Sequence, residues 1–86
     1  MNERWKVKAK PASLDARFEF DNYDNLRSFL DVLADKADEL EHHPNVSFGT
    51  QHVSVIIYST SNELKEVDYA LAKGMDEAYQ RFANNS

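Results

Sequence analysis

The 86-residue sequence contains no cysteine, only two glycines and two prolines, and no long hydrophobic run. Without cysteine, neither a disulfide nor a zinc–thiolate site is available to stabilise so short a chain. Hydrophobic residues make up 42% of the sequence, which is enough for a globular core but too dispersed for a membrane-spanning helix. We therefore expect one small domain over residues 1–86 that gains stability by self-association, as a dimer or a tetramer.

Acidic residues outnumber basic ones by 15 to 10, which gives a net charge of −5. Residues 15–41 hold nine acidic residues against three basic ones, whereas residues 4–10 hold four cations and no anion. Because an acidic domain repels phosphate groups, we expect no nucleic-acid binding, and a basic protein surface is the more natural partner. No signal or transit peptide pattern follows Met1, so we expect a cytoplasmic protein that does not bind membranes.

Alternation of apolar and polar residues predicts the strands. Residues 5–10 alternate apolar side chains with lysines, as in a half-buried edge strand, and residues 14–20 form a second strand that pairs with it as a hairpin. Residues 51–58 give the clearest strand signal. The preceding residues 45–50 form a short extended segment, in which Gly49 is available for a positive φ.

Two amphipathic helices complete the pattern. The first covers about residues 22–41, with Asp21 as N-cap, and Pro44 ends it because a proline excludes the helical conformation for His43. The second covers about residues 63–82. The order β-β-α-β-β-α predicts an α+β fold, in which an antiparallel four-stranded sheet carries two long helices packed on one face.

Two adjacent histidines follow the first predicted helix, in the sequence Glu41-His42-His43-Pro44. An imidazole titrates near neutral pH, so both histidines are candidates for general acid–base catalysis. The structural alternative is that they stabilise a helix C-terminus, where positive charge interacts favourably with the helix dipole. We expect no metal site, because adjacent residues project about 100° apart on a helix and no carboxylate stands at a recognisable ligand spacing.

Two surfaces are candidates for contact with a partner protein. Four acidic residues occupy the face of the first helix opposite its apolar stripe, and this face is either simply solvated or docks onto a basic patch. They are Asp24, Asp31, Asp35 and Asp38. On the strand of residues 51–58, Ile56 and Tyr58 point away from the core-facing valines, so they form either an interface or a cross-strand contact. His52 shares their face and is more simply explained as a solvent-facing or interface residue than as a catalytic group.

Several segments resemble the pterin-4a-carbinolamine dehydratase family, and the resemblance spans nearly the whole chain. They are the Phe-rich strand of residues 17–20, His42-His43-Pro44 after a long amphipathic helix, the valine-rich strand of residues 53–57, and the helix start at residues 64–68. The resemblance implies the dehydratase fold and an enzyme that eliminates water from a 4a-hydroxytetrahydropterin by general acid–base catalysis. We expect no bound cofactor.

The resemblance also assigns roles to individual residues. His42 and His43 match the two histidines at the helix end that surround the pterin, and Asp68 matches an acidic residue that opens the last helix. The family's third histidine aligns with Thr60, or with Ser59 or Ser61 if the register shifts. A threonine hydroxyl cannot shuttle protons at neutral pH. The resemblance therefore implies a residual catalytic set of His42, His43 and Asp68.

A narrower resemblance concerns one divergent branch of the family, the dehydratase-like proteins of α-carboxysome gene clusters. It rests on Lys10-Pro11, on residues 27–31, and above all on residues 44–49 followed by residues 53–55. This branch implies a catalytically degenerate RuBisCO assembly factor, associated with carboxysomes, whose partners are RuBisCO subunits or an assembly intermediate. The missing third histidine favours this function. The alternatives are an active dehydratase with a pterin substrate and a dimerisation cofactor for another regulator.

Overall fold

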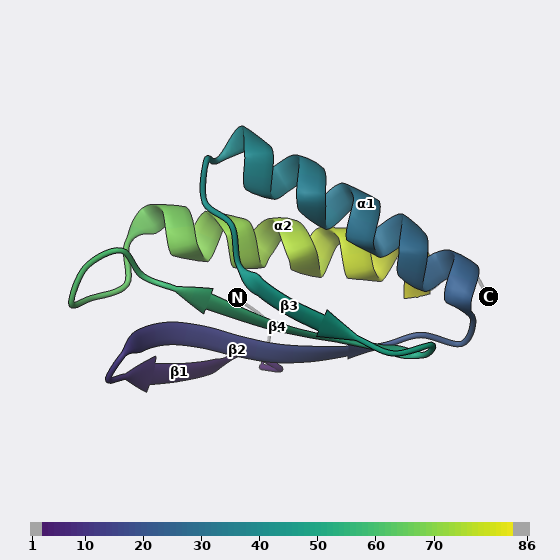
Figure 1. Cartoon of the computed structure of the whole chain (residues 1–86), viewed down its shortest axis with the longest axis horizontal. Coiled ribbons are helices and arrows are strands. Elements are labelled where there is room, and N and C mark those ends of the chain that lie inside the picture. The colour runs from purple at the N-terminus through teal and green to yellow at the C-terminus, as the bar shows by residue number, and fades with distance from the viewer. Residues whose placement is uncertain (1–2, 84–86) are drawn as a thin grey trace.

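The computed structural model describes residues 3–83 of the chain. The elements are β1 (Lys6–Ala9), β2 (Ala12–Glu19), α1 (Tyr23–Glu39), β3 (Asn45–Phe48), β4 (His52–Tyr58) and α2 (Glu66–Ala83). The sheet is antiparallel throughout, in the order β1-β2-β4-β3, and both helices lie over one of its faces (Figure 1). The predicted β-β-α-β-β-α architecture is therefore confirmed.

The core lies between the sheet and the two helices. In the central strands β2 and β4, Leu14 is opposite Ile57 and Phe18 is opposite Val53, and all four side chains are fully buried. Because successive residues of a strand point to opposite faces, polar residues alternate with them on the bare face of the sheet. Burying each such large side chain contributes about 1.5–3 kcal/mol. The helices complete the core with Leu26 and Phe29 from α1 and with Leu71, Ala72 and Met75 from α2.

The N-cap of α1 is Asn22, which corrects the predicted cap at Asp21. Asn22 has an extended backbone with φ −147° and ψ 161°, and its side-chain oxygen accepts a hydrogen bond from the Asn25 backbone N–H at 2.8 Å. Asparagine and aspartate cap helices equally well, so residue type alone does not choose between two neighbouring candidates. The predicted acidic residue in the first turn, Asp24, is in place.

The start of α2 is also later than predicted, at Glu66 instead of Glu63. The hydroxyl groups of Ser59 and Ser61 both donate to the backbone carbonyl of Glu63. Serine side chains that bond to nearby backbone groups stabilise turns in competition with helix. The loop therefore continues through Glu63 before the helix begins.

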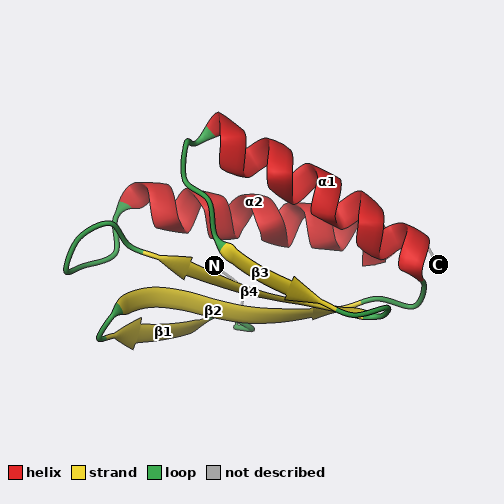
Figure 2. Ribbon diagram, in the orientation of Figure 1, coloured by secondary structure: helices red, strands yellow, loops and turns green. Residues whose placement is uncertain are grey.

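The outer strand β1 is more exposed than predicted. All four of its residues are exposed, including Val7 at 60%, and the buried residue of this segment is Trp5, just before the strand. The reason is position: β1 lies at an edge of the sheet, beyond the cover of the helices (Figure 2). The expected half-buried strand is thus an exposed edge strand.

A partly buried polar contact holds Arg4 and Trp5 against α2. Trp5 Nε1 donates to Asp76 Oδ1 at 2.9 Å, and Arg4 forms an ion pair with the same oxygen at 2.8 Å. The Arg4 guanidinium also lies 4.5 Å from the ring centre of Tyr79, a favourable cation–π distance. Together these contacts hold the segment before β1 in place.

Gly49, in the turn between β3 and β4, does not have the positive φ expected of it. Its small size matters instead, because an added Cβ would lie 2.8 Å from Cε1 of His52 and the ring would have to shift. Glycine therefore makes room for the His52 ring against the turn.

Candidate functional site

The end of α1 decides where the two adjacent histidines lie. Glu41 has a left-handed backbone with φ 53°. Its N–H donates to the carbonyl of Asp38 at 3.2 Å, and the N–H of His42 donates to the carbonyl of Ala37 at 3.0 Å. These two hydrogen bonds define a Schellman motif, with Glu41 in the position that glycine usually occupies. The helix therefore ends at Glu39, before the steric effect of Pro44 operates, which corrects the predicted cause of termination.

Because they follow this left-handed residue, the histidines lie outside the helix and contact different carboxylates. His42 is 11% exposed, and its Nε2 lies 2.6 Å from Oδ1 of Asp68. His43 is 67% exposed, and its Nε2 lies 2.8 Å from Oδ1 of Asp38. The structure thus brings His42 and Asp68 together, whereas His43 is directed toward solvent and toward the exposed face of α1.

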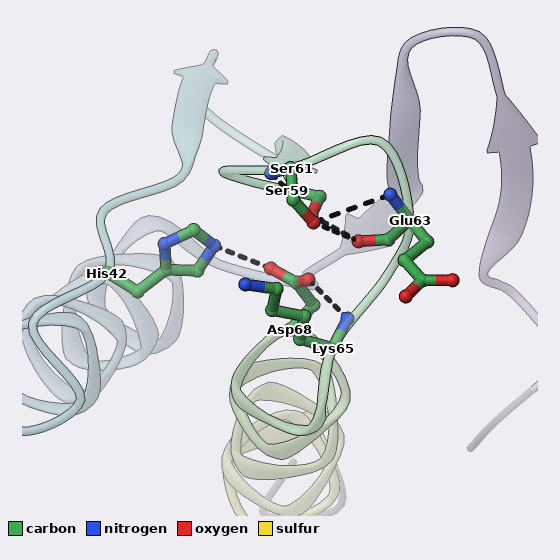
Figure 3. A network of polar contacts seen from close by, with 6 residues as sticks. All are labelled: His42, Ser59, Ser61, Glu63, Lys65 and Asp68. Carbon is green, nitrogen blue, oxygen red and sulfur yellow. Dashed lines mark hydrogen bonds and ion pairs between the residues drawn. The ribbon is translucent and has the colours of Figure 1, made fainter.

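Asp68 joins two elements through its two carboxylate oxygens. Its Oδ2 accepts a hydrogen bond from the backbone N–H of Lys65 at 2.8 Å, and the Lys65 carbonyl accepts the first helical hydrogen bond of α2 from Tyr69 at 3.3 Å. An acidic residue that reaches back to the N-cap N–H is one half of a capping box. Asp68 therefore caps α2 with one oxygen and contacts His42 with the other (Figure 3).

The contact between His42 and Asp68 is close but poorly aligned. The two atoms are 2.6 Å apart, yet neither Nε2 of His42 nor Oδ1 of Asp68 has a hydrogen bond of acceptable angle to any group within residues 3–83. Both atoms are buried. A buried carboxylate beside an imidazole is a pairing that general acid–base catalysis uses.

The loop of residues 59–63 lies across from this pair (Figure 3). Its polar groups bond mainly to one another: Ser61 N–H donates to Ser59 Oγ at 3.2 Å, and Ser61 Oγ donates to the Glu63 carbonyl at 3.0 Å. Thr60, the position that the resemblance assigns to a third histidine, is exposed. The loop therefore contributes hydroxyl groups to this region and no imidazole.

The two predicted contact surfaces lie on opposite sides of the molecule. The acidic residues of α1, Asp24, Asp31, Asp35 and Asp38, are all exposed. Ile56 is half-buried and Tyr58 is 40% exposed on the face of the sheet that the helices leave bare. Ile56 lies opposite Asp15 and Asn45 in the register and helps to line an open hollow of about 350 Å³.

Sequence reasoning missed the contact between His43 and Asp38. Asp38 was assigned only to the acidic face, and no periodicity relates a residue inside a helix to one beyond a left-handed turn. Within residues 3–83, no three His, Cys, Asp or Glu side chains gather closely enough to hold a metal ion. In the same part of the chain, neither helix is long and apolar enough to cross a membrane.

A family model decides the family. The model for pterin 4 alpha carbinolamine dehydratase matches residues 1–78. The chain belongs to this family. A relative from Saccharolobus islandicus (strain M.14.25 / Kamchatka #1) is 29% identical over 87 aligned positions, which cover 98% of this chain and 86% of the relative. A relative from Rhizobium leguminosarum bv. trifolii is 30% identical over 78 positions, covering 90% and 77%. Both are provisionally named pterin-4-alpha-carbinolamine dehydratases.

Two solved structures of pterin dehydratase-like proteins share this fold. One is a pterin dehydratase-like protein identified as a RuBisCO assembly factor in the alpha-carboxysome, with a TM-score of 0.81 and 34% identity over 91% of this chain and 92% of its own. The other is a transcriptional coactivator/pterin dehydratase from Brucella melitensis, with a TM-score of 0.82 and 23% identity over 90% and 83%. The resemblance to the dehydratase family and to its assembly-factor branch is therefore confirmed.

Proposed function

We propose that this protein assists the assembly of RuBisCO and does not act as a dehydratase. The observation that carries the proposal is its 34% identity, over about nine-tenths of both chains, to the pterin dehydratase-like RuBisCO assembly factor. The partner would be RuBisCO subunits or an assembly intermediate. A carboxysome-associated protein of the cytoplasm, dimeric or tetrameric, would suit this role.

The surroundings of His43 and the residue at position 60 support the loss of catalysis. The proposed catalytic set is His42, His43 and Asp68, but His43 contacts Asp38 on an exposed surface. Thr60 replaces the third histidine that the family resemblance requires. Because a positioned acid or base contributes about 10²–10⁴-fold to a rate, a site that lacks one such group is expected to be strongly impaired.

Two exposed surfaces are suited to transient contact with a client. The acidic face of α1 (Asp24, Asp31, Asp35 and Asp38) would steer the protein toward a basic client surface. The alternative contact surface is the bare face of the sheet around Ile56 and Tyr58, on the opposite side of the molecule, which would offer apolar contact area. A modest polar interface of this kind releases its client readily once the client's own subunit contacts are complete.

Co-expression tests the proposal. RuBisCO subunits produced with this protein are expected to give more soluble, assembled enzyme on native gels than subunits produced without it. The variant Asp31→Asn/Asp35→Asn should reduce the gain, while the charge-matched control Glu3→Gln/Glu77→Gln, which changes exposed residues elsewhere, should keep it. Absence of both a gain in assembly and a complex with the large subunit would contradict the proposal.

The second candidate function is an active dehydratase, and the buried contact between His42 and Asp68 favours it. Purified protein would then dehydrate a 4a-hydroxytetrahydropterin faster than the spontaneous reaction, and His42→Ala would remove most of that rate. A rate equal to the spontaneous one, in protein shown to be folded, would exclude this function.

A further inference from the structure

The free edge of β1 carries a second surface that the histidine site does not include. β1 pairs with β2 on one side, and its other side pairs with no strand within residues 3–83. The hairpin turn between β1 and β2 lies at the same end of the molecule as the loop before α2 (Figure 1). An exposed strand edge of this kind offers backbone donors and acceptors to another extended chain.

An open hollow of about 320 Å³ lies between this edge and the start of α2. Its apolar lining includes Val7 of β1, Leu64 of the preceding loop and Tyr69 of α2. Val7 is 60% exposed and Tyr69 is 42% exposed, so both side chains have apolar surface available for contact. Val7 lies opposite Leu14 in the register, so the two side chains share one face of the sheet. Because Leu14 is buried in the core, Val7 points to the face that the helices cover.

The same edge is basic, in a protein whose net charge is −5. Lys6 and Lys8 alternate with Val7 and therefore point to the bare face of the sheet, and Lys10 follows in the turn. Lys8 lies 3.4 Å from Asp15, an exposed pair that contributes little, whereas Lys6 and Lys10 have no ion pair among the described residues. Glu63 is the acidic residue in the lining of the hollow.

Lysines on an edge strand also serve to prevent unwanted strand pairing. Prevention of strand pairing does not by itself explain the hollow. Exposed apolar side chains beside a free edge promote association, which is the opposite effect. An extended chain whose residues alternate between acidic and apolar would match both the lysines of β1 and the apolar hollow. Its acidic side chains would meet Lys6 and Lys8 on one face, while its apolar side chains would meet Val7 and Tyr69 on the other.

We propose that the β1 edge binds an extended segment of a partner protein in which acidic and apolar residues alternate, and that this segment adds a fifth strand to the sheet. A second copy of β1 is a poor occupant, because it would bring its own lysines against Lys6 and Lys8. The proposal does not depend on the proposed function, since it involves neither RuBisCO nor the contact between His42 and Asp68.

Synthetic peptides test the alternation directly. The probe is a peptide of about eight residues that alternates glutamate with valine, and its control has the same composition in two blocks. Calorimetry should show that the alternating peptide binds at least about tenfold more tightly than the block peptide, and that binding weakens as salt increases. Equal affinity for both peptides, or for polyglutamate, would overturn the proposal in favour of general attraction of anions.

Variants and amide exchange locate the peptide. Lys6→Glu/Lys8→Glu should weaken binding by about tenfold or more, whereas the control Arg27→Glu/Arg81→Glu, which changes the same charge on exposed helix positions, should leave it within about twofold. In the unaltered protein, the peptide should slow hydrogen exchange of the β1 amides that point away from β2. Binding without such protection, or equal loss in both double variants, would overturn strand addition even if the variants were partly unfolded.

Discussion

Nε2 of His42 lies 2.6 Å from Oδ1 of Asp68, and through this contact the segment just after α1 meets the first turn of α2. This contact belongs to the candidate site and also connects two elements of the fold. Asp68 is 1% exposed and also caps α2, so the carboxylate links two helix termini that are far apart in the sequence.

Removal of the Asp68 carboxylate should destabilise the fold. In Asp68→Ala, the N–H of Lys65 loses its acceptor and His42 loses its buried partner. A lost cap costs about 0.5–2 kcal/mol and an unsatisfied buried group about 1–3 kcal/mol, so a loss of about 2 kcal/mol is expected. Urea unfolding measures it. The control Asp35→Ala, on an exposed helix face, should change stability by less than about 0.5 kcal/mol.

Asp68→Asn separates the two roles of the carboxylate. An amide oxygen can still accept from the Lys65 N–H, while the charge opposite His42 is removed. Asp68→Asn should therefore retain more stability than Asp68→Ala. Equal losses in the two variants would show that the contact with His42, and not the helix cap, dominates.

A substitution at Glu41, the left-handed residue after α1, should instead increase the stability of the fold. Glu41 has φ 53°, which costs a residue with a Cβ about 1 kcal/mol relative to glycine. Glu41→Gly should therefore stabilise the protein, or at least not destabilise it, by thermal or urea unfolding. The control Ala34→Gly lies at an exposed position inside the helix and should destabilise by about 1 kcal/mol. Destabilisation of similar size in both variants would contradict the Schellman geometry.

The helices and strands could be predicted because the spacing of apolar residues in the sequence indicates which face of each element is buried. The spacing of Leu26, Phe29 and Leu33 places them on one helical face, and the alternation of Val53 and Val55 places them on one side of a strand. All five are buried in the structure. Positions at element ends were less predictable, since Asp21 and Asn22 are equally good caps and the cap geometry decides between them.

The candidate site could be predicted only in part. The family resemblance named His42 and Asp68, which the structure brings together from different elements. No sequence signal indicated that Glu41 adopts a left-handed backbone, because glutamate is uncommon there. That one residue determines that His43 faces Asp38 and solvent instead of Asp68. Adjacency in the sequence was therefore a poor guide to adjacency in space.

The turn between β3 and β4 offers a test of local packing. Gly49→Ala would place a Cβ 2.8 Å from Cε1 of His52, so the ring must move and a loss of about 1 kcal/mol is expected. Because the backbone of Gly49 has no positive φ, the clash with His52 is the specific cause. The loss should largely disappear when Gly49→Ala is made in a His52→Ala background, which a double-mutant cycle measures. An undiminished loss would point to the backbone and not to the ring.

Restoration of the third histidine tests whether the site is a remnant. Thr60 occupies the position that the family resemblance assigns to a histidine, on a loop across from His42 and Asp68. A positioned acid–base group contributes about 10²–10⁴-fold, so Thr60→His is expected to raise pterin dehydration at least about tenfold above the parent protein. The gain should require the existing imidazole, so that Thr60→His/His42→Ala returns to the parent rate. Asn62→His, at an exposed position of the same loop, controls for a histidine placed nearby at random. If Thr60→His and Asn62→His are equally inactive in folded protein, the site has lost more than this one residue. If the gain persists without His42, the buried contact with Asp68 serves the fold alone.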